Sequence, residues 1–222
     1  EKVIQDGDKV RVIHNWVNTE ELSPGIKNNE FSSLYKIDSK FVVSFAGILG
    51  HLQDFEVILQ AAKNLEKYND IEFIIVGDGV AKGSIEENIR KKNIRNVRLI
   101  PMQPKDKYPQ VLHSSDVGLV TLVKDLKTPV IPSKILSIMS SAKPVLATML
   151  LSGDAPKIIK ESKGGFFYDA GDAKGLTEGI LSFYNNTDKI AEYGLRGRKY
   201  ILRNFSLEIS CKNYRELFEE MS

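Results

Sequence analysis

Ser133 and Lys134 follow Pro132 and begin a stretch whose apolar residues have the spacing of a helix. Apolar residues at positions 135, 138, 139 and 142 recur every three or four residues, which predicts an amphipathic helix with Ser133 as its N-cap. The free backbone N–H groups of a first helical turn attract anions. The helix dipole would contribute about 0.3–1 kcal/mol there and a charge-assisted bond from lysine roughly 1.5–3 kcal/mol, so Lys134 would dominate. The alternative is an ordinary surface helix with a solvated lysine.

The turn from Gly47 to His51 offers a second place where an anion could bind. It follows a continuous apolar segment, residues 41–46, and leads into a stretch with helical spacing. The glycines at 47 and 50 would let the backbone approach a ligand closely, and His51 could donate a hydrogen bond to a phosphate. The alternative is a tight strand-to-helix turn that leaves the histidine exposed.

Gly77, Gly79 and Gly83 nearly match the G-x-G-x-x-G pattern of dinucleotide-binding folds, but the third glycine comes one residue late. The acidic residue expected after the next strand is also missing, because residues 97–100 run into Pro-Met-Gln. Both departures argue against a nicotinamide cofactor. They favour a turn at a strand end that lies close to a ligand.

Motifs for several other chemistries are missing from the sequence. It has no G-x-x-x-x-G-K-[ST] loop, no H-E-x-x-H, no spaced set of Cys and His, and no G-x-S-x-G elbow. The Asp-Gly-Asp sequence at 6–8 matches the D-x-D pattern by which some sugar transferases hold a divalent cation. Its central glycine and polar surroundings favour a turn instead. We therefore expect no metal and no cofactor.

Apolar segments of strand length alternate with amphipathic segments from residue 41 onward. This pattern predicts an α/β fold, a Rossmann-like parallel sheet with helices on both faces. Ligands bind at the carboxyl ends of the strands in such sheets, which selects the loops at 47–53, 77–83, 101–104 and 122–134. Strands are expected at 41–46, 71–76, 97–100, 117–122, 145–147 and 165–168, helices at 54–68, 84–92, 105–114, 156–161, 173–184, 187–204 and 207–221, and a polar loop at 27–33.

The composition excludes several classes of protein. With 31 Lys and Arg against 29 Asp and Glu, the net charge of +2 is too balanced for nucleic acid to be the main partner. The single cysteine, Cys211, excludes an internal disulfide and favours a reducing compartment, so we expect a cytoplasmic protein. No apolar run approaches the roughly 18 residues that a membrane span needs. The chain begins with Glu1, so we expect it to be part of a longer protein.

Six short segments in order resemble the C-terminal half of GT-B glycosyltransferases of group 1, the family-4 retaining enzymes. They are I-H-N-W-V-N-x-E-E-L-x-P, F-A-G-I-L-G-H-L-Q, I-V-G-D-G, P-M-Q-P-K, S-S-D-V-G-L and P-S-K followed by A-K-P-V-L-A. The likeness covers nearly the whole chain. It is greatest to a subgroup that builds bacterial surface polysaccharides, such as capsule and O-antigen, with N-acetylated amino sugars.

The resemblance implies one half of a GT-B fold, with 1–40 from the interdomain region, 41–205 as the donor-binding domain and 206–222 as a helix that packs toward an absent N-terminal domain. It places the donor diphosphate between the Gly50-His51 turn and the start of the Lys134 helix, and the base against Met102 and Gln103. The donor-binding residues would be Gly47, Gly50, Gly77, Gly79, Met102, Gln103, Ser133 and Ser137, and the catalytic ones Lys134 and His51.

The implied function is transfer of a sugar from a UDP-linked donor to a glycan or lipid-linked acceptor, with retention and without a metal. Partners would be the nucleotide-sugar and the protein's own N-terminal domain, with any contact to the inner face of the cytoplasmic membrane made by that domain. The isolated chain is expected to turn over nothing.

Two departures from the family pattern keep alternatives open. Ile48 and Gln53 stand where many members have an arginine and a lysine, and Pro129 and Ser137 stand where many have glutamates. Asp125 or Asp154 could supply the missing acidic contact. The alternatives are a GT-B UDP-sugar epimerase, which should carry carboxylates in its cleft, and a non-catalytic nucleotide-sugar binding module.

Overall fold

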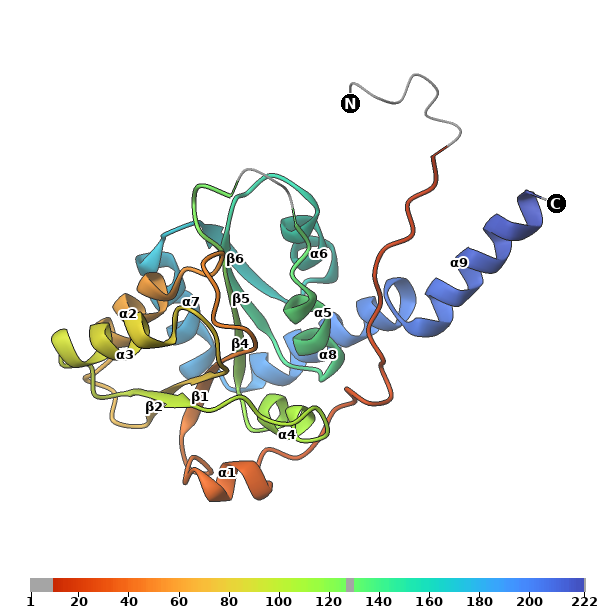
Figure 1. The fold of residues 1–222 in the computed structure, drawn as a ribbon. Coiled ribbons are helices and arrows are strands. Elements are labelled where there is room, and N and C mark those ends of the chain that lie inside the picture. The colour runs from red at the N-terminus through yellow and green to blue at the C-terminus, as the bar shows by residue number, and fades with distance from the viewer. Residues whose placement is uncertain (1–9, 127–129, 222) are drawn as a thin grey trace.

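The computed structural model describes residues 10–126 and 130–221, and a six-stranded parallel sheet forms the centre of that part (Figure 1). The strands lie in the order β3-β2-β1-β4-β5-β6, and every neighbouring pair is parallel. The predicted Rossmann-like α/β fold is therefore confirmed. The strands are β1 (Phe41–Ala46), β2 (Ile71–Val76), β3 (Val97–Ile100), β4 (Val117–Thr121), β5 (Val145–Met149) and β6 (Gly165–Asp169).

Helices cover both faces of the sheet, because its central strands are apolar on both sides. Every residue of β1, β4 and β5 is buried. One face packs against α2 (Phe55–Asn64), α3 (Lys82–Lys91) and α7 (Ala173–Tyr184). The other face packs against α1 (Glu30–Leu34), α4 (Tyr108–His113), α5 (Ser133–Ser140), α6 (Asp154–Ser162) and α8 (Asp188–Asn204).

The strand order reverses between β1 and β4. Chain connections leave these two neighbouring strands in opposite directions along the sheet, and such a switch point opens a crevice at the carboxyl ends of the strands. The loop after β1 and the described part of the connection from β4 to α5 border this crevice. The first of them contains Gly47 and His51, and the second leads to Lys134.

Glycines let α5 pack unusually close to its neighbours. A Cβ on Gly118 of β4 would lie 2.6 Å from the Ile138 side chain. On the other side of α5, a Cβ on Gly194 of α8 would lie 1.9 Å from the carbonyl oxygen of Ala142. A Cβ on Gly197, one turn further along α8, would lie 3.0 Å from the Met139 side chain. The helix that begins at Ser133 is thus held between the sheet and α8 by contacts that a larger residue would prevent.

The carboxyl end of α5 is tied to α8 and to the N-terminal part of the chain. The Arg198 guanidinium donates to the carbonyl oxygen of Ser140, and the Ser140 hydroxyl donates to that of Leu22 at 2.8 Å. A cation at the carboxyl end of a helix also interacts favourably with its dipole. The carboxyl end of α5 therefore has a defined position.

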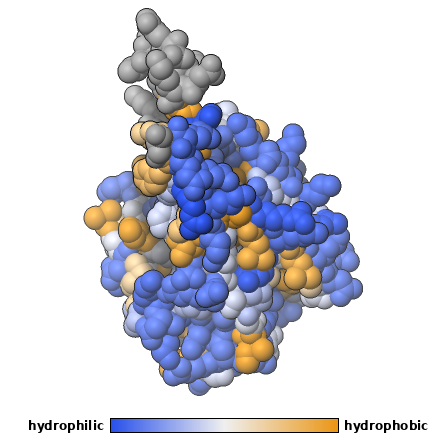
Figure 2. Space-filling view, turned by 90° about the vertical axis from the view of Figure 1, so that its right-hand side faces the viewer, coloured by the Kyte–Doolittle hydropathy of each residue, from blue (hydrophilic) through white to orange (hydrophobic). Residues whose placement is uncertain are grey.

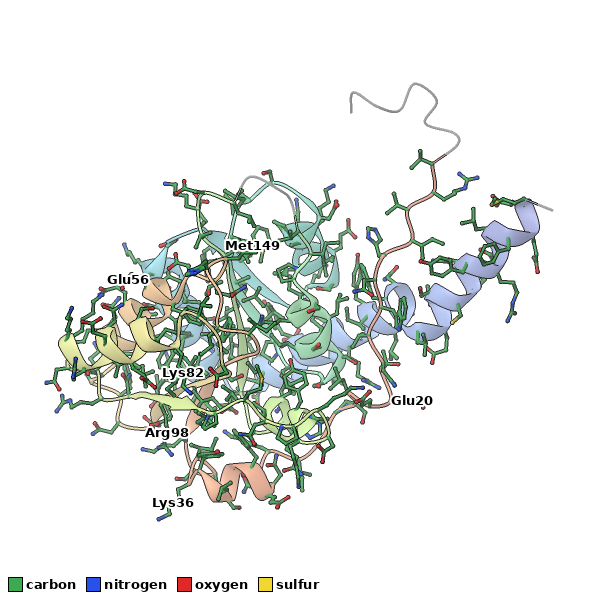
Figure 3. The ribbon with its side chains drawn as sticks, in the orientation of Figure 1. Glu20, Lys36, Glu56, Lys82, Arg98 and Met149 are labelled. Atoms are coloured by element: carbon green, nitrogen blue, oxygen red, sulfur yellow. The ribbon has the colours of Figure 1, made fainter. Side chains whose placement is uncertain are left out.

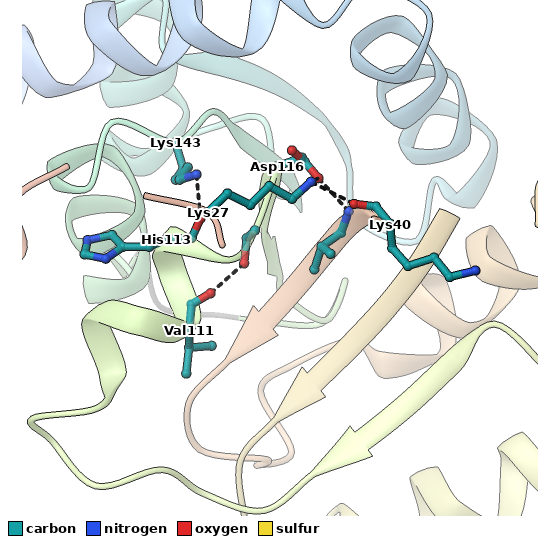
Figure 4. A network of polar contacts seen from close by, with 8 residues as sticks. Lys27, Lys40, Val111, His113, Asp116 and Lys143 are labelled. Carbon is teal, nitrogen blue, oxygen red and sulfur yellow. Dashed lines mark hydrogen bonds and ion pairs between the residues drawn. The ribbon is translucent and has the colours of Figure 1, made fainter. Parts of the chain in front are cut away.

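A polar network holds the amino ends of β1 and β4 together (Figure 4). The Asp116 carboxylate accepts from the Val42 N–H at 2.7 Å and from the Lys27 ammonium at 2.5 Å. Lys27 also donates to the carbonyl oxygen of Lys40 at 2.7 Å, and Lys143 donates to that of His113 at 2.8 Å. The crevice lies between β1 and β4 at their carboxyl ends, and this network holds the same two strands at their amino ends.

The sheet edge at β3 is tied to α1 through Arg98 (Figure 3). Its guanidinium pairs with Glu72 of β2 at 2.9 Å and donates to the carbonyl oxygen of Tyr35. The expectation of a polar loop at 27–33 was wrong, because α1 begins there. Asn29 and Ser32 form a capping box, in which each side-chain oxygen accepts from the other residue's N–H, at 3.1 and 2.9 Å.

The last helix, α9 (Leu207–Glu220), projects from the rest of the fold (Figure 1). Exposed fractions of 36% for Leu207, 42% for Tyr214 and 63% for Phe218 confirm the expectation that its apolar face is partly uncovered. Viewed from the side of α9, hydrophobic residues lie in several patches between hydrophilic ones (Figure 2). That this face packs against a further domain stays a prediction.

We predict that Gly118→Ala destabilises the protein by about 1–3 kcal/mol, because the new methyl group overlaps Ile138 and must displace α5. Gly83→Ala is the matched control, since a Cβ there meets nothing within 4 Å and alanine favours the helix. Urea unfolding would measure both changes. Equal midpoints for the two variants would contradict the close packing of α5.

A second prediction concerns stability at alkaline pH. Burial lowers the pKa of the Lys143 ammonium from 10.5 to about 8. Between these values the unfolded chain binds a proton that the folded chain has lost, so stability rises with pH from about 8 toward 10. Lys143→Met should reduce this rise. Urea midpoints across that range would test it, and an unchanged slope in the variant would contradict it.

Candidate functional site

A cleft of about 520 Å³ lies at the carboxyl ends of β1 and β4. It brings together six of the residues singled out from the sequence, which come from the turn after β1 and the first two turns of α5. Ile48, Leu52, Gln53 and Tyr108 contribute further surface. The expectation that the glycine turn and the lysine face the same cleft is confirmed. The six residues are Gly47, Gly50, His51, Ser133, Lys134 and Ser137.

Lys134 is a half-buried cation that lies over an aromatic ring. Its ammonium lies 5.0 Å from the centre of the Phe45 ring, a cation–π contact. Burial lowers the pKa of the Lys134 ammonium, and no carboxylate in residues 10–126 or 130–221 offsets this effect. A charge held this way is stabilised by an anion that enters the cleft.

Gly47 allows the lysine stem to lie against the backbone. Its φ of +137° is a conformation that residues with a side chain rarely adopt. A Cβ at this position would lie 2.7 Å from Cε and 3.1 Å from Nζ of Lys134. Both the turn and the lysine therefore require glycine here.

Gly77 and Gly79 support the turn and do not line the cleft. A Cβ on Gly77 would lie 2.0 Å from the Gly47 carbonyl oxygen, and one on Gly79 would lie 2.5 Å from that of Leu49. Leu49 donates to the carbonyl oxygen of Asp78 and accepts from the N–H of Ala81, both at 2.9 Å. The near match to a dinucleotide fingerprint thus has a packing role, and direct donor contact by these glycines stays a prediction.

Hydrogen bonds shape the rest of the turn. The Gly50 N–H donates to the Gln53 side-chain oxygen at 2.9 Å, so a ligand that uses this N–H must displace that oxygen. Asp54 caps α2 by accepting from the Val57 N–H at 3.1 Å. Val123 donates to the carbonyl oxygen of Leu52 at 3.0 Å and so joins the two loops that border the cleft.

Ser133 is not the N-cap of α5, which corrects the sequence-based prediction. The cap is Pro132, whose extended backbone places its carbonyl oxygen to accept from the Ile135 N–H at 3.0 Å. Ser133 is therefore the first helical residue, with its hydroxyl outside the cap. The N–H groups of Ser133 and Lys134 still lack intrahelical acceptors, so the helix keeps its anion-attracting end.

Tyr108 is a cleft residue that the sequence gave no reason to select. It begins α4, and burial raises the pKa of its hydroxyl. The hydroxyl bonds to the side chain of Ser137, which also donates to the Ser133 carbonyl oxygen at 3.3 Å. Only its position after the carboxyl-edge loop at 101–107 could have marked it.

Met102 and Gln103 lie outside the cleft. They follow β3, which is separated from β1 by β2. Met102 is 45% exposed, and the Gln103 amide donates to the carbonyl oxygen of Pro101 at 2.9 Å. Contact between these residues and a nucleoside base stays a prediction.

Groups suited to a metal ion are missing from the described part of the chain. Within residues 10–126 and 130–221, no three His, Cys, Asp or Glu side chains are grouped to hold one. The Asp-Gly-Asp sequence at 6–8 lies outside the described residues. None of the described helices has the length and hydrophobicity to cross a membrane.

Comparison with known proteins gives one family match. The model for "Glycosyl transferases group 1" matches residues 26–200. A probable glycosyltransferase of Pseudomonas aeruginosa, WbjE, is 27% identical over 95% of this chain and 52% of its own length. A 2-deoxystreptamine N-acetyl-D-glucosaminyltransferase of Niallia circulans is 23% identical over 98% of this chain and 55% of its own. The chain thus spans about half the length of these relatives.

A solved structure shows the same fold. HepE of Anabaena, in complex with UDP and glucose, superposes with a TM-score of 0.81 at 17% identity. The match covers 96% of this chain and 58% of HepE.

We predict that Gly47→Ala displaces the Lys134 side chain and destabilises the protein by about 1–3 kcal/mol, because it adds a clash to an unfavourable φ. Gly171→Ala is the matched control, since its φ is +83° but a Cβ there meets nothing within 4 Å. NMR signals of the Lys134 side chain should move only in the first variant. A similar loss of stability in both, with those signals unchanged, would contradict the contact.

Proposed function

This chain belongs to the group 1 glycosyl transferases, and from that premise we propose that its cleft binds the diphosphate of a UDP-sugar donor. The donor sugar would pass to a glycan or lipid-linked acceptor bound by a further, N-terminal domain. The exposed apolar face of α9 and the half-length match to relatives support such a domain. The presence of UDP in the HepE structure supports UDP as the nucleotide.

The position of Lys134 carries this proposal. Its ammonium stands at the start of α5, against the Gly47 turn, with burial lowering its pKa and no described carboxylate to pair with it. Burial deprives the Lys134 ammonium of stabilisation by water, and a diphosphate bound there would stabilise its charge instead. The free N–H groups of the first turn of α5 would donate to the remaining phosphate oxygens, and so would the Gly50 N–H once the ligand displaces the Gln53 side-chain oxygen.

The same groups would assist sugar transfer. When the bond between sugar and diphosphate breaks, negative charge grows on the departing phosphate oxygen. A fixed lysine and fixed N–H groups stabilise that charge more than they stabilise the intact donor, which lowers the barrier. Lys134 would neutralise the leaving group, and His51, exposed at the rim of the cleft, would donate a further hydrogen bond.

The finer parts of the proposal are the sugar and the stereochemistry. We propose an N-acetylated amino sugar, because the Niallia circulans relative is named as an N-acetyl-D-glucosaminyltransferase. Retention follows from the resemblance to the retaining enzymes of the family.

A non-catalytic nucleotide-sugar binding module is the second candidate function. Within the described residues no carboxylate lines the cleft that holds Lys134, where an enzyme would hold its donor. The same observation disfavours a GT-B epimerase, which needs carboxylates there to move protons. Transfer of radiolabelled sugar by the full-length protein, lost in Lys134→Met, would separate catalysis from simple binding.

We predict that Lys134→Met weakens UDP binding roughly 10- to 150-fold, the equivalent of losing about 1.5–3 kcal/mol of charge-assisted hydrogen bonding. Methionine keeps an apolar stem against Phe45 and Gly47 and removes only the charge. Lys160→Met, at an exposed position of α6, controls for the change in net charge. Calorimetric titration with UDP measures both, and equal affinities would overturn the role of Lys134.

A further inference from the structure

The Lys134 side chain has the properties of a nucleophile as well as those of a cation. It lines a cleft of about 520 Å³, which is large enough to admit a small reagent. Among the described residues no carboxylate lines this cleft to hold the side chain in its charged form. Burial lowers the pKa of the Lys134 ammonium, so a larger fraction of it is the neutral amine at a given pH than for an exposed lysine. The function argued above uses only the charged form.

The surroundings of the amine favour one class of reagent. Ser133 and Lys134 both line the cleft, and their N–H groups at the start of α5 lack intrahelical acceptors. A phosphate group held in the cleft would bring any group bonded to it close to the Lys134 amine, and such proximity accelerates a reaction. Acyl phosphates are small reagents of this kind, because their phosphate group is bonded to an electrophilic carbonyl carbon.

The packing of the lysine stem limits where the amine can lie. Its ammonium is 5.0 Å from the centre of the Phe45 ring, and a Cβ on Gly47 would lie 2.7 Å from the Lys134 Cε. The stem therefore lies against a ring on β1 and against the turn that follows β1. The amine is thus held beside the space that a phosphate would occupy, whereas the amine of an exposed lysine moves freely in water.

We propose that Lys134 is a site of acylation by acyl phosphates, and that this modification switches off donor binding. The neutral Nζ attacks the carbonyl carbon, an N–C bond forms, and the bond from that carbon to the phosphate oxygen breaks. Inorganic phosphate leaves with the electron pair of the broken bond, and water takes up the amine proton. The product is a neutral amide, which fills part of the cleft and cannot pair with a diphosphate. The loss of donor binding rests on the proposed function, whereas acylation needs only a phosphate group held in the cleft.

Acylation of this chain by acetyl phosphate, mapped by mass spectrometry of its peptides, tests the site. The references are Lys160 of α6 and Lys199 of α8, which are exposed and do not line the cleft. Lys134 should react roughly tenfold faster than either, the gain that one charge-assisted hydrogen bond to the phosphate provides. The N-hydroxysuccinimide ester of acetic acid has no phosphate, so with it the preference for Lys134 should fall. An equal preference with both reagents, or none with acetyl phosphate, would overturn the proposal.

Competition experiments separate this inference from the proposed function. Excess inorganic phosphate, compared with chloride at the same ionic strength, should slow acylation of Lys134 and not that of Lys160. UDP should slow it as well. Protection by phosphate without protection by UDP would overturn the proposed function and leave the acylation site standing. Protection by neither would show that the cleft does not hold the reagent, and the proposal would fail.

Calorimetric titration with UDP after acetyl phosphate treatment measures the effect on binding. The fraction of the chain that binds UDP should fall in step with the fraction acylated at Lys134. Lys134→Arg keeps a positive charge and forms no amide with this reagent, so the same treatment should not change the UDP affinity of that variant. UDP binding that survives complete acylation of Lys134, or that falls with acylation of Lys160 or Lys199 instead, would overturn the switch.

Discussion

Close packing of α5 between β4 and α8 is the constraint on which the cleft depends. Without a Cβ on Gly118, Gly194 and Gly197, the helix lies against the sheet on one side and against α8 on the other. Protein interiors are too densely packed for such a helix to shift without cost. The first turn of α5, and Lys134 with it, therefore has a defined position relative to the turn after β1.

This constraint explains why a half-buried cation is tolerated with no carboxylate partner among the described residues. The Lys134 stem has apolar and backbone neighbours in Phe45 and Gly47, while its charge loses hydration. A flexible loop would let the ammonium return to water. Because the helix cannot move, the unfavourable burial persists until an anion offsets it, and such pre-organisation is what makes a fixed charge effective in binding and catalysis.

The two ends of the sheet have different structural roles. At the amino ends of β1 and β4, Asp116 satisfies a backbone N–H and a lysine at once, which holds the strands in register. At the carboxyl ends, Gly77 and Gly79 let the loop after β2 pack closely against the backbone of the turn after β1. Gly77 and Gly79, which the sequence suggests as ligand contacts, thus support the turn after β1, and it is that turn that lines the cleft.

Much of the fold follows from the sequence because continuous apolar segments need cover on both faces. The six predicted strands all exist, and α7 has the predicted bounds. Helix ends were less predictable: α4 begins at Tyr108, three residues later than expected, and α1 formed where only polarity was visible. The N-cap of α5 was misplaced because the Pro132 backbone, and not the preference of Ser133, determines where the helix starts.

Residue types and their spacing alone determined the α/β class, the order of strands and helices, and the likeness of the chain to one family of transferases. They also selected Lys134 and the Gly47 turn as parts of an anion site. Only the tertiary structure decided that these two meet, that Tyr108 joins them, and that Gly77, Met102 and Gln103 stay outside the cleft. The physical reason is that the order of strands in a sheet, and the distance at which a helix packs on it, depend on contacts between residues far apart in the chain.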